Sequence, residues 1–88
     1  MKAIDVIVSG RVQGVGFRAF TRKNAVMLGV KGYVENQRDG TVHAVMEGNE
    51  HQVDKLLEVV KNGPMTSRVR DVKVKDIDKS GYTGFDVR

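Results

Sequence analysis

The 88-residue chain contains no cysteine and no tryptophan, and its only aromatic residues are two tyrosines and three phenylalanines. The lack of cysteine excludes disulfides and thiolate chemistry; it leaves the redox compartment undetermined but suits the cytosol. No apolar run is long enough to span a membrane, and the first residues lack the long apolar region of a signal peptide. We therefore expect a cytoplasmic protein that does not have a membrane as partner.

The length and the apolar composition bound the fold. A chain of this size forms one domain, here residues 1–88, that buries roughly 60–65% of its unfolded surface. Valine occurs 16 times, against three leucines and three isoleucines. Because β-branched residues favour strands, we expect a core built largely on a sheet.

The net charge of +4 raises the question of nucleic acid binding. Most basic residues are scattered among acidic ones, and only residues 68–75 resemble a basic stripe, with Arg68, Arg70, Lys73 and Lys75. Strand alternation puts these arginines and lysines on opposite faces unless a bulge intervenes. An RNA-reading sheet also needs exposed aromatic residues, which are scarce here. The charge therefore indicates a solvated surface, or attraction of anionic substrates, and disfavours nucleic acid as partner.

The hydrophobic pattern predicts seven elements. Strands are expected at residues 3–9, 31–37, 41–47, 68–77 and 84–88. A first helix is expected at 18–28, with Phe20, Asn24, Met27 and Leu28 at helical spacing. A second helix follows the N-cap Asn49, buries Val53, Leu56, Leu57 and Val60, and ends at Gly63-Pro64. Asp39-Gly40 predicts a tight hairpin between the second and third strands.

This order predicts an α+β fold of the ferredoxin-like βαββαβ type, with a short fifth strand at the C-terminus. Two right-handed crossovers place both helices on one face of an antiparallel sheet, and the third strand lies between the first and second. The first and second strands then run parallel. Their carboxyl ends, and the loops that follow them, meet at one edge of the sheet.

The first of these loops is the segment Gly10–Arg18, sequence GRVQGVGFR. Its glycines allow a tight turn with inward N–H groups, and the following helix N-terminus adds further donors. Arg18 adds a planar fork of donors that matches phosphate. A purely steric need for glycine at a strand–helix junction is the alternative. A dinucleotide-binding fold is excluded by size, and no Gly-Lys-Ser/Thr marks a P-loop.

Asn36 ends the second strand, one strand away from this loop. Alternation places it on the same face as Val34, so that its amide points toward the helices if Val34 is buried. Alternatively, Asn36 satisfies the hairpin as an Asx turn. The residues themselves leave both interpretations open.

Two segments resemble the signatures of the acylphosphatase family: Gly10–Arg18, and Gly32-Tyr-Val-Glu-Asn36 followed by Gly40-Thr-Val42. The resemblance covers the whole chain, including Gly48 and Asn62-Gly-Pro64. Glu35 departs from the basic or neutral residue usual in the family, and Tyr33 replaces the more frequent tryptophan. Glu35 faces away from Asn36 by alternation, so we expect it to alter charge or affinity and not to abolish activity.

The resemblance implies a ferredoxin-like hydrolase that cleaves the carboxyl–phosphate bond of acyl phosphates to a carboxylate and inorganic phosphate. It implies that Arg18 and Asn36 are catalytic, with Asn36 positioning water. The phosphate would be held by Arg18 with the loop residues Val12, Gln13, Gly14, Val15, Gly16 and Phe17. No metal, no other cofactor and no phosphoenzyme are implied. The expected ligands are small acyl phosphates, inorganic phosphate and other small anions, and the expected state is a monomer.

Two other functions stay open. The chain could be a non-catalytic anion-binding module, as similar domains occur inside larger carbamoyl-transferring proteins, or it could bind RNA on the open sheet face. Other catalytic arrangements lack support: His43 and His51 are too far apart in the sequence to suggest a metal site, and Ser9 and Thr21 lack a nearby His–Asp pair.

Overall fold

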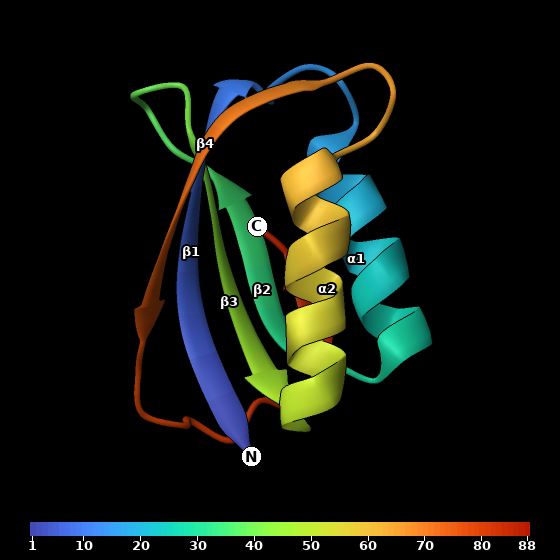
Figure 1. Cartoon of the computed structure of the whole chain (residues 1–88), viewed down its shortest axis with the longest axis vertical. Coiled ribbons are helices and arrows are strands. Elements are labelled where there is room, and N and C mark those ends of the chain that lie inside the picture. Colours follow the sequence, from blue (N-terminus) through green and yellow to red (C-terminus); the bar gives the residue numbers. More distant parts are fainter.

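A computed structural model describes residues 1–88. The chain order is β1 (Lys2–Arg11), α1 (Phe17–Leu28), β2 (Lys31–Asn36), β3 (Val42–Gly48), α2 (Glu50–Asn62), β4 (Arg68–Asp76) and β5 (Phe85–Val87). The five strands form one sheet in the order β4-β1-β3-β2-β5, and both helices cover the same face of it (Figure 1). This confirms the predicted ferredoxin-like fold, with β3 between β1 and β2. Neither helix is long and apolar enough to cross a membrane.

Four strands pair antiparallel, as predicted, while β5 pairs with β2 in parallel. The fifth strand therefore makes the sheet mixed. It reaches this edge because the connection after β4 passes the end of the sheet near the N-terminus before the chain turns back (Figure 1). Glu47 on β3 anchors that connection, since its buried carboxylate accepts hydrogen bonds from the backbone N–H groups of Ser80 and Gly81 at 3.0 and 2.9 Å.

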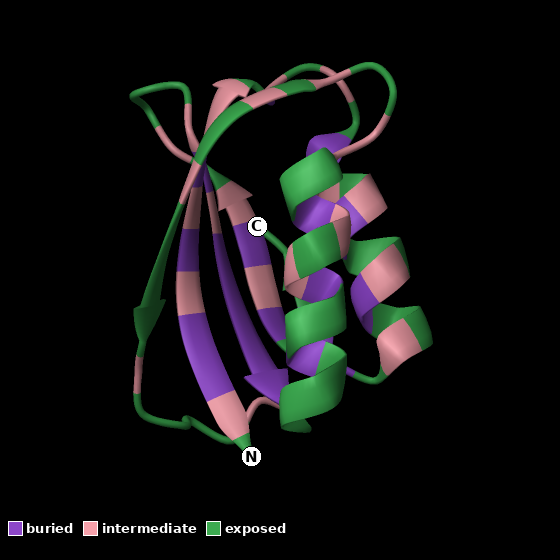
Figure 2. Ribbon diagram, in the orientation of Figure 1, coloured by how far each residue is buried: buried purple, intermediate pink, exposed green.

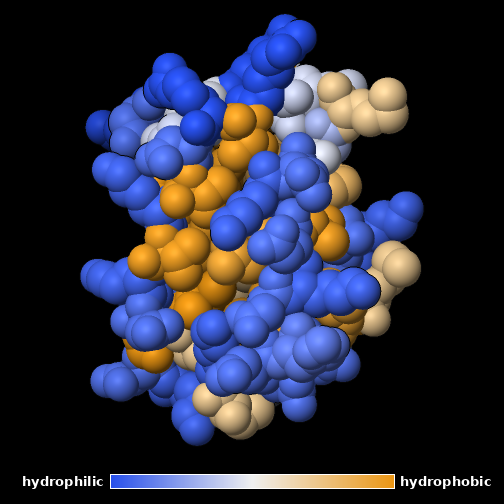
Figure 3. Space-filling view, in the orientation of Figure 1, coloured by the Kyte–Doolittle hydropathy of each residue, from blue (hydrophilic) through white to orange (hydrophobic).

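The core lies between the sheet and the helices (Figure 2). Alternation along β1 buries Ile4, Val6 and Val8 completely, and α2 buries Val53, Leu56 and Val60 against them. Burying an aliphatic side chain of this size contributes about 1.5–3 kcal/mol. Apolar side chains reach the surface in a strip between the sheet and α2, bordered by hydrophilic ones (Figure 3). The core holds both crossovers against the sheet and thereby fixes the loops at its edge.

Helix α1 buries a face with one aromatic, one polar and one small residue. Its buried residues are Phe17, Thr21 and Ala25, whereas Met27 is 73% exposed. Thr21 can be buried because its hydroxyl donates to the Phe17 carbonyl at 2.9 Å, so no polar atom is left unpaired. The helix predicted from the spacing of Phe20, Asn24, Met27 and Leu28 is confirmed, and its fully buried residues lie at other positions.

A bulge interrupts the pairing of β1 with β4. Ser9 lies opposite Asp71 and Gly10 lies opposite Val69, so Arg70 has no partner in β1. Gly10 has φ +123°, and a Cβ at this position would lie 2.1 Å from the Arg68 carbonyl oxygen. The bulge shifts the alternation, and Arg68 now lies on the same side of β4 as Lys73 and Lys75. The sequence pattern allowed this arrangement only with a bulge, and the bulge is present.

Candidate active site

The loop after β1 offers a row of free backbone donors. Gly14 and Gly16 are in the left-handed region, with φ 73° and 78°. None of the backbone N–H groups of residues 12–16 donates a hydrogen bond within the chain. The first turn of α1 follows directly and adds N–H groups that have no partner one turn earlier. Successive N–H groups around a left-handed glycine form a concave site for an anion.

Side chains from two distant segments hold this loop in place. The Gln13 amide nitrogen donates to the carbonyls of Gln37 and Thr41 at 2.7 and 2.9 Å, which ties the loop to the β2–β3 hairpin. On the other side, the Thr66 hydroxyl donates to the Val15 carbonyl at 2.7 Å. The backbone donors are therefore positioned by the hairpin and by the connection between α2 and β4.

Arg18 lies in the first turn of α1. One guanidinium nitrogen, Nη1, donates to the main-chain oxygen of Arg88 at 2.9 Å. One turn further along, Arg22 Nε donates to the carbonyl of Phe85 at 3.1 Å. Helix α1 thus contacts the last segment of the chain through two arginines. The bond to Arg88 uses one donor of Arg18 and leaves its other N–H groups for a ligand.

Asn36 is the last residue of β2, and its side chain makes no hydrogen bond within the chain. The hairpin is satisfied by Asp39 instead, whose carboxylate accepts from the backbone N–H and the hydroxyl of Thr41 at 3.0 and 2.6 Å. These hydrogen bonds lower the pKa of the Asp39 carboxyl below its usual value. Asn36 forms no Asx turn, and its side-chain amide has no hydrogen-bond partner within the chain.

A cavity of about 210 Å³ brings the loop, Arg18 and Asn36 together. It is lined by Val12, Gly14, Gly16, Phe17, Arg18, Ala19, Asn36 and Val87. This volume is below the roughly 300–1,000 Å³ of sites for drug-sized ligands, so it suits a small group such as phosphate. Of the predicted site residues, only Gln13 and Val15 are absent from the lining. The side chain of Gln13 and the carbonyl of Val15 hold the loop from behind.

The sequence patterns missed four residues near this cavity. Ala19 and Val87 line it, while Thr66 and Arg88 hold the loop and Arg18. Ala19 follows Arg18 on the helix and was within reach of a spacing argument. The other three come from segments more than 45 positions away along the chain. No local pattern signals such contacts.

The histidines lie elsewhere. The His43 ring lies on the opposite face of the sheet, with Nε2 2.6 Å from an Asp5 oxygen and Nδ1 3.0 Å from a Glu35 oxygen. Glu35 thus points away from Asn36, as alternation predicted. No group of three His, Cys, Asp or Glu side chains is arranged to hold a metal ion.

Comparison with known proteins identifies the family of this chain. The family model described as Acylphosphatase matches residues 4–87. The chain belongs to the acylphosphatase family. It is 65% identical over 88 residues to the acylphosphatase of Methanocella arvoryzae, with both chains covered in full. It matches the crystal structure of the Bacillus subtilis acylphosphatase with a TM-score of 0.97 and 38% identity, covering 100% of this chain and 99% of that one.

A larger protein contains a similar domain. The chain is 32% identical to part of HypF from T. kodakarensis, with a TM-score of 0.87. This match covers 100% of the present chain and 12% of the HypF chain. The activity is assigned from the acylphosphatases that match this chain over the full length of both proteins. The chain is a hydrolase that acts on acid anhydrides, and its reaction is the acylphosphatase reaction, the hydrolysis of acyl phosphates.

Proposed function

We propose that Arg18 and the backbone N–H groups of residues 12–17 hold the phosphoryl group of an acyl phosphate, while Asn36 orients the attacking water. One observation carries the proposal: the free donors of the loop, the Arg18 guanidinium and the unpaired Asn36 amide line a single small cavity. The steric explanation of the loop glycines does not account for this convergence.

The chemistry needs few groups. Phosphoryl transfer depends mostly on positioning and on stabilising charge spread over three oxygens, which a planar guanidinium and backbone donors can do. The water oxygen forms a bond to phosphorus as the phosphorus–oxygen bond to the acyl group breaks. The carboxylate leaves with the electron pair, and the water proton passes to a phosphate oxygen. An amide is no base, so Asn36 acts by holding the water.

Several further properties belong to the proposal. Residues 1–88 act as a single catalytic domain and as a monomer, without metal or other cofactor. Inorganic phosphate and other small anions bind the same cavity as the phosphoryl group, and nucleic acid is no substrate of it. The proposed site of action is the cytoplasm, with which a chain without cysteine is compatible.

The test is hydrolysis of benzoyl phosphate by the purified protein, with and without EDTA. We expect turnover that the chelator leaves unchanged. Loss of turnover with EDTA contradicts the metal-free mechanism, while phosphate binding without any turnover identifies an anion-binding module.

The role of Asn36 has its own test. We expect Asn36→Ala to lower kcat about a hundredfold, because the water loses its orientation. Inhibition by inorganic phosphate should change little in this variant. Asn62→Ala is the matched control, since Asn62 lies at the exposed end of α2 and its side chain donates one hydrogen bond, to the Glu58 carbonyl. A parallel loss of phosphate inhibition in Asn36→Ala would show that Asn36 binds phosphate and does not position water.

A further inference from the structure

The loop after β1 is contacted by a segment that lies far from it in the sequence. The connection between α2 and β4, residues 63–67, runs beside this loop at one end of the sheet (Figure 1). From this connection, the Thr66 hydroxyl donates to the Val15 carbonyl at 2.7 Å. Thr66 is exposed and does not line the cavity that holds Arg18 and Asn36. It can therefore act on that cavity only through the loop.

The turn that carries Thr66 is rigid. The backbone N–H and the hydroxyl of Ser67 both donate to the Pro64 carbonyl, at 2.9 and 2.7 Å, and the proline ring fixes its own φ. Gly63 packs against the buried Phe17 ring, because a Cβ on Gly63 would lie 3.0 Å from that ring. The turn is thus fixed relative to the start of α1.

The bond between Thr66 and Val15 sets the direction of a neighbouring donor. A trans peptide group is planar, so its C=O and N–H point to opposite sides. The Val15 carbonyl and the Gly16 N–H belong to one such group. Since the carbonyl is turned to Thr66, the Gly16 N–H points away from Thr66. Gly16 lines the cavity and Thr66 does not, so this is the direction that serves the cavity.

This peptide group needs an external restraint. Gly16 has φ 78°, and glycine adopts either sign of φ readily, so half a turn of the peptide plane would exchange its C=O and N–H. The next peptide group is restrained by α1 itself, because the Gly16 carbonyl accepts from the Phe20 N–H at 3.0 Å. The group between Val15 and Gly16 precedes the helix, and Thr66 supplies the restraint there.

We propose that Thr66 is a positioning residue for acyl phosphate hydrolysis, and that its hydroxyl keeps the Gly16 N–H directed at the phosphoryl group. This role rests on the proposed phosphate site. In the reversed orientation, a peptide oxygen would face the phosphate oxygens and repel them. The hydrogen bond to the Val15 carbonyl also polarises the peptide group and strengthens its N–H as a donor.

Variants of the turn test this role by activity. Thr66→Val keeps the side-chain shape, removes the hydroxyl and should fold, because Thr66 is exposed. We expect kcat/KM for benzoyl phosphate to fall about three- to tenfold, as for the loss of one neutral hydrogen bond, and inhibition by inorganic phosphate to weaken similarly. Thr66→Ser keeps the hydroxyl and should restore both values. A Thr66→Ser variant as poor as Thr66→Val would overturn the proposal.

Ser67→Ala is the matched control. It removes a hydroxyl from the same turn that donates only to the Pro64 carbonyl, while the Ser67 backbone N–H still closes the turn. We expect kcat/KM and phosphate inhibition to change little in this variant. Equal losses in Ser67→Ala and Thr66→Val would attribute the effect to the turn as a whole and overturn the role of the Thr66 hydroxyl.

An NMR titration of ¹⁵N-labelled protein with inorganic phosphate separates this role from the proposed phosphate site. In the wild type we expect shifts at the amides of Gly16 and Phe17. In Thr66→Val the saturating shift at Gly16 should shrink, while Phe17 should respond as before, because α1 restrains its peptide group. Equal Gly16 shifts in the two proteins would overturn the role of Thr66 alone. The lack of any shift at both amides in the wild type would overturn the phosphate site as well.

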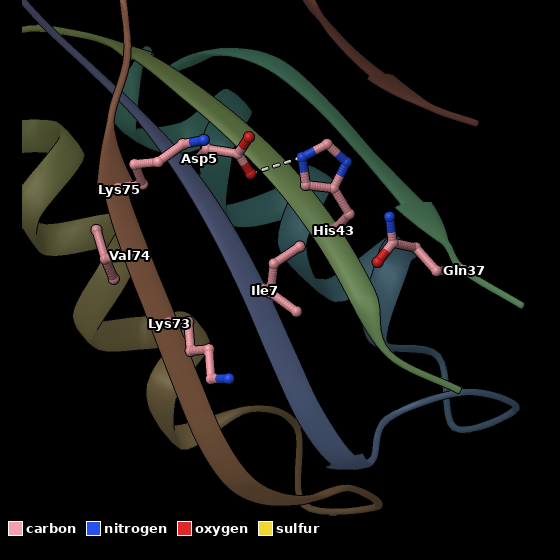
Figure 4. Close-up of a pocket in the computed structure, with 7 residues that line it drawn as sticks. All are labelled: Asp5, Ile7, Gln37, His43, Lys73, Val74 and Lys75. Carbon is pink, nitrogen blue, oxygen red and sulfur yellow. Dashed lines mark ion pairs between the residues drawn. The ribbon is translucent and has the colours of Figure 1, made fainter. Parts of the chain in front are cut away.

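The opposite face of the sheet provides the reference amides for this titration. A cavity of about 470 Å³ lies there, lined by residues of β1, β3 and β4 (Figure 4). Charges of both signs lie close together on this face, since Asp5 is 2.6 Å from His43 and opposite Lys75 in the strand register. We expect phosphate to leave the amides of Ile7 and His43 unchanged. Larger shifts there than at Gly16 would place phosphate on this face and overturn the proposal.

Discussion

The Arg18 guanidinium has one contact inside the protein and a planar set of donors left over. Its bond to the Arg88 main-chain oxygen restrains the group, and Arg18 lines the proposed catalytic cavity. A lysine would keep the positive charge but lose both the fixed plane and the paired donors.

We therefore expect Arg18→Lys to lower kcat/KM for benzoyl phosphate by about ten- to a hundredfold, which corresponds to the roughly 1.5–3 kcal/mol of one charge-assisted hydrogen bond. Arg22→Lys is the matched control one turn away, because Arg22 contacts the Phe85 carbonyl and lies outside the cavity. Similar losses in the two variants would mean that helix α1 needs arginine only to hold the end of the chain.

Asp39 gives a prediction on pH. Its side-chain and backbone hydrogen bonds with Thr41 hold its pKa below the usual 3.8 in the folded protein. The charged form is thus favoured by folding, and its contribution to stability is present above about pH 4 and disappears as the pH falls through the lowered pKa. Asp39→Asn should destabilise the protein most near neutral pH and least at about pH 3.

Urea unfolding at several pH values measures this difference. Asp78→Asn serves as control, since Asp78 is exposed and makes no hydrogen bond. A wild-type advantage over Asp39→Asn that stays constant from pH 7 to pH 3 would contradict the assignment of the hairpin's acid dependence to Asp39.

At the scale of single residues, the sequence was most informative where a motif is short and local. Arg18 and Asn36 were predicted because they stand in two recognisable segments, and the structure places both at one cavity. Their catalytic roles stay predictions. The Thr66 bond to Val15 was not predictable, because it joins residues 51 positions apart and serves a carbonyl that every residue type carries.

At the scale of elements, each predicted strand and helix is present within two residues of its expected ends. The spacing of the apolar residues did not identify which face of α1 is buried. The apolar Met27 and Val26 are 73% and 56% exposed, while a threonine is buried. Hydropathy ranks Thr21 as polar and cannot see the Phe17 carbonyl that satisfies its hydroxyl. The bulge in β1–β4 was likewise left open, because it depends on the pairing of two strands.

Gly10 tests that bulge. Gly10→Ala should lower the free energy of unfolding by about 1–3 kcal/mol or more, because φ is +123° and the new Cβ would meet the Arg68 carbonyl at 2.1 Å. Gly84→Ala is the control, as a Cβ there has open space, and should change stability by no more than about 0.5 kcal/mol. Denaturant unfolding measures both. Equal stability of the two variants would mean that the strands can pair without the bulge.

At the scale of the whole molecule, β5 links the core to the proposed catalytic cavity. Phe85 is 4% exposed and belongs to the core, and two residues later Val87 lines the cavity. The backbone N–H of Arg88 donates to the Val34 carbonyl at 2.8 Å, and its guanidinium lies 3.6 Å over the Tyr33 ring. Burial also raises the pKa of the Tyr33 phenol above its usual 10.0. The short strand is therefore held from both faces of the sheet.

We expect Phe85→Ala to cost about 3–5 kcal/mol of stability, a large share of the roughly 5–15 kcal/mol available to a small domain. Catalysis should fall as well, at temperatures where the variant is still folded, because the Arg88 oxygen no longer fixes Arg18. Met27→Ala removes a large but exposed side chain and should affect neither property. An unchanged kcat/KM in folded Phe85→Ala would show that the packing of β5 does not affect catalysis. Thermal unfolding and the benzoyl phosphate assay give the two readouts.

The donors of the loop that is proposed to bind phosphate are peptide groups, and this affects which substitutions the protein tolerates. Replacing the side chain of Val12 or Val15 deletes no donor, because every residue except proline brings its own N–H. The feature of this loop that must be kept is its backbone conformation, which is set by the left-handed turns at Gly14 and Gly16. Most of the donors proposed for phosphate therefore depend on backbone conformation, and a single substitution other than proline removes them only if it changes that conformation.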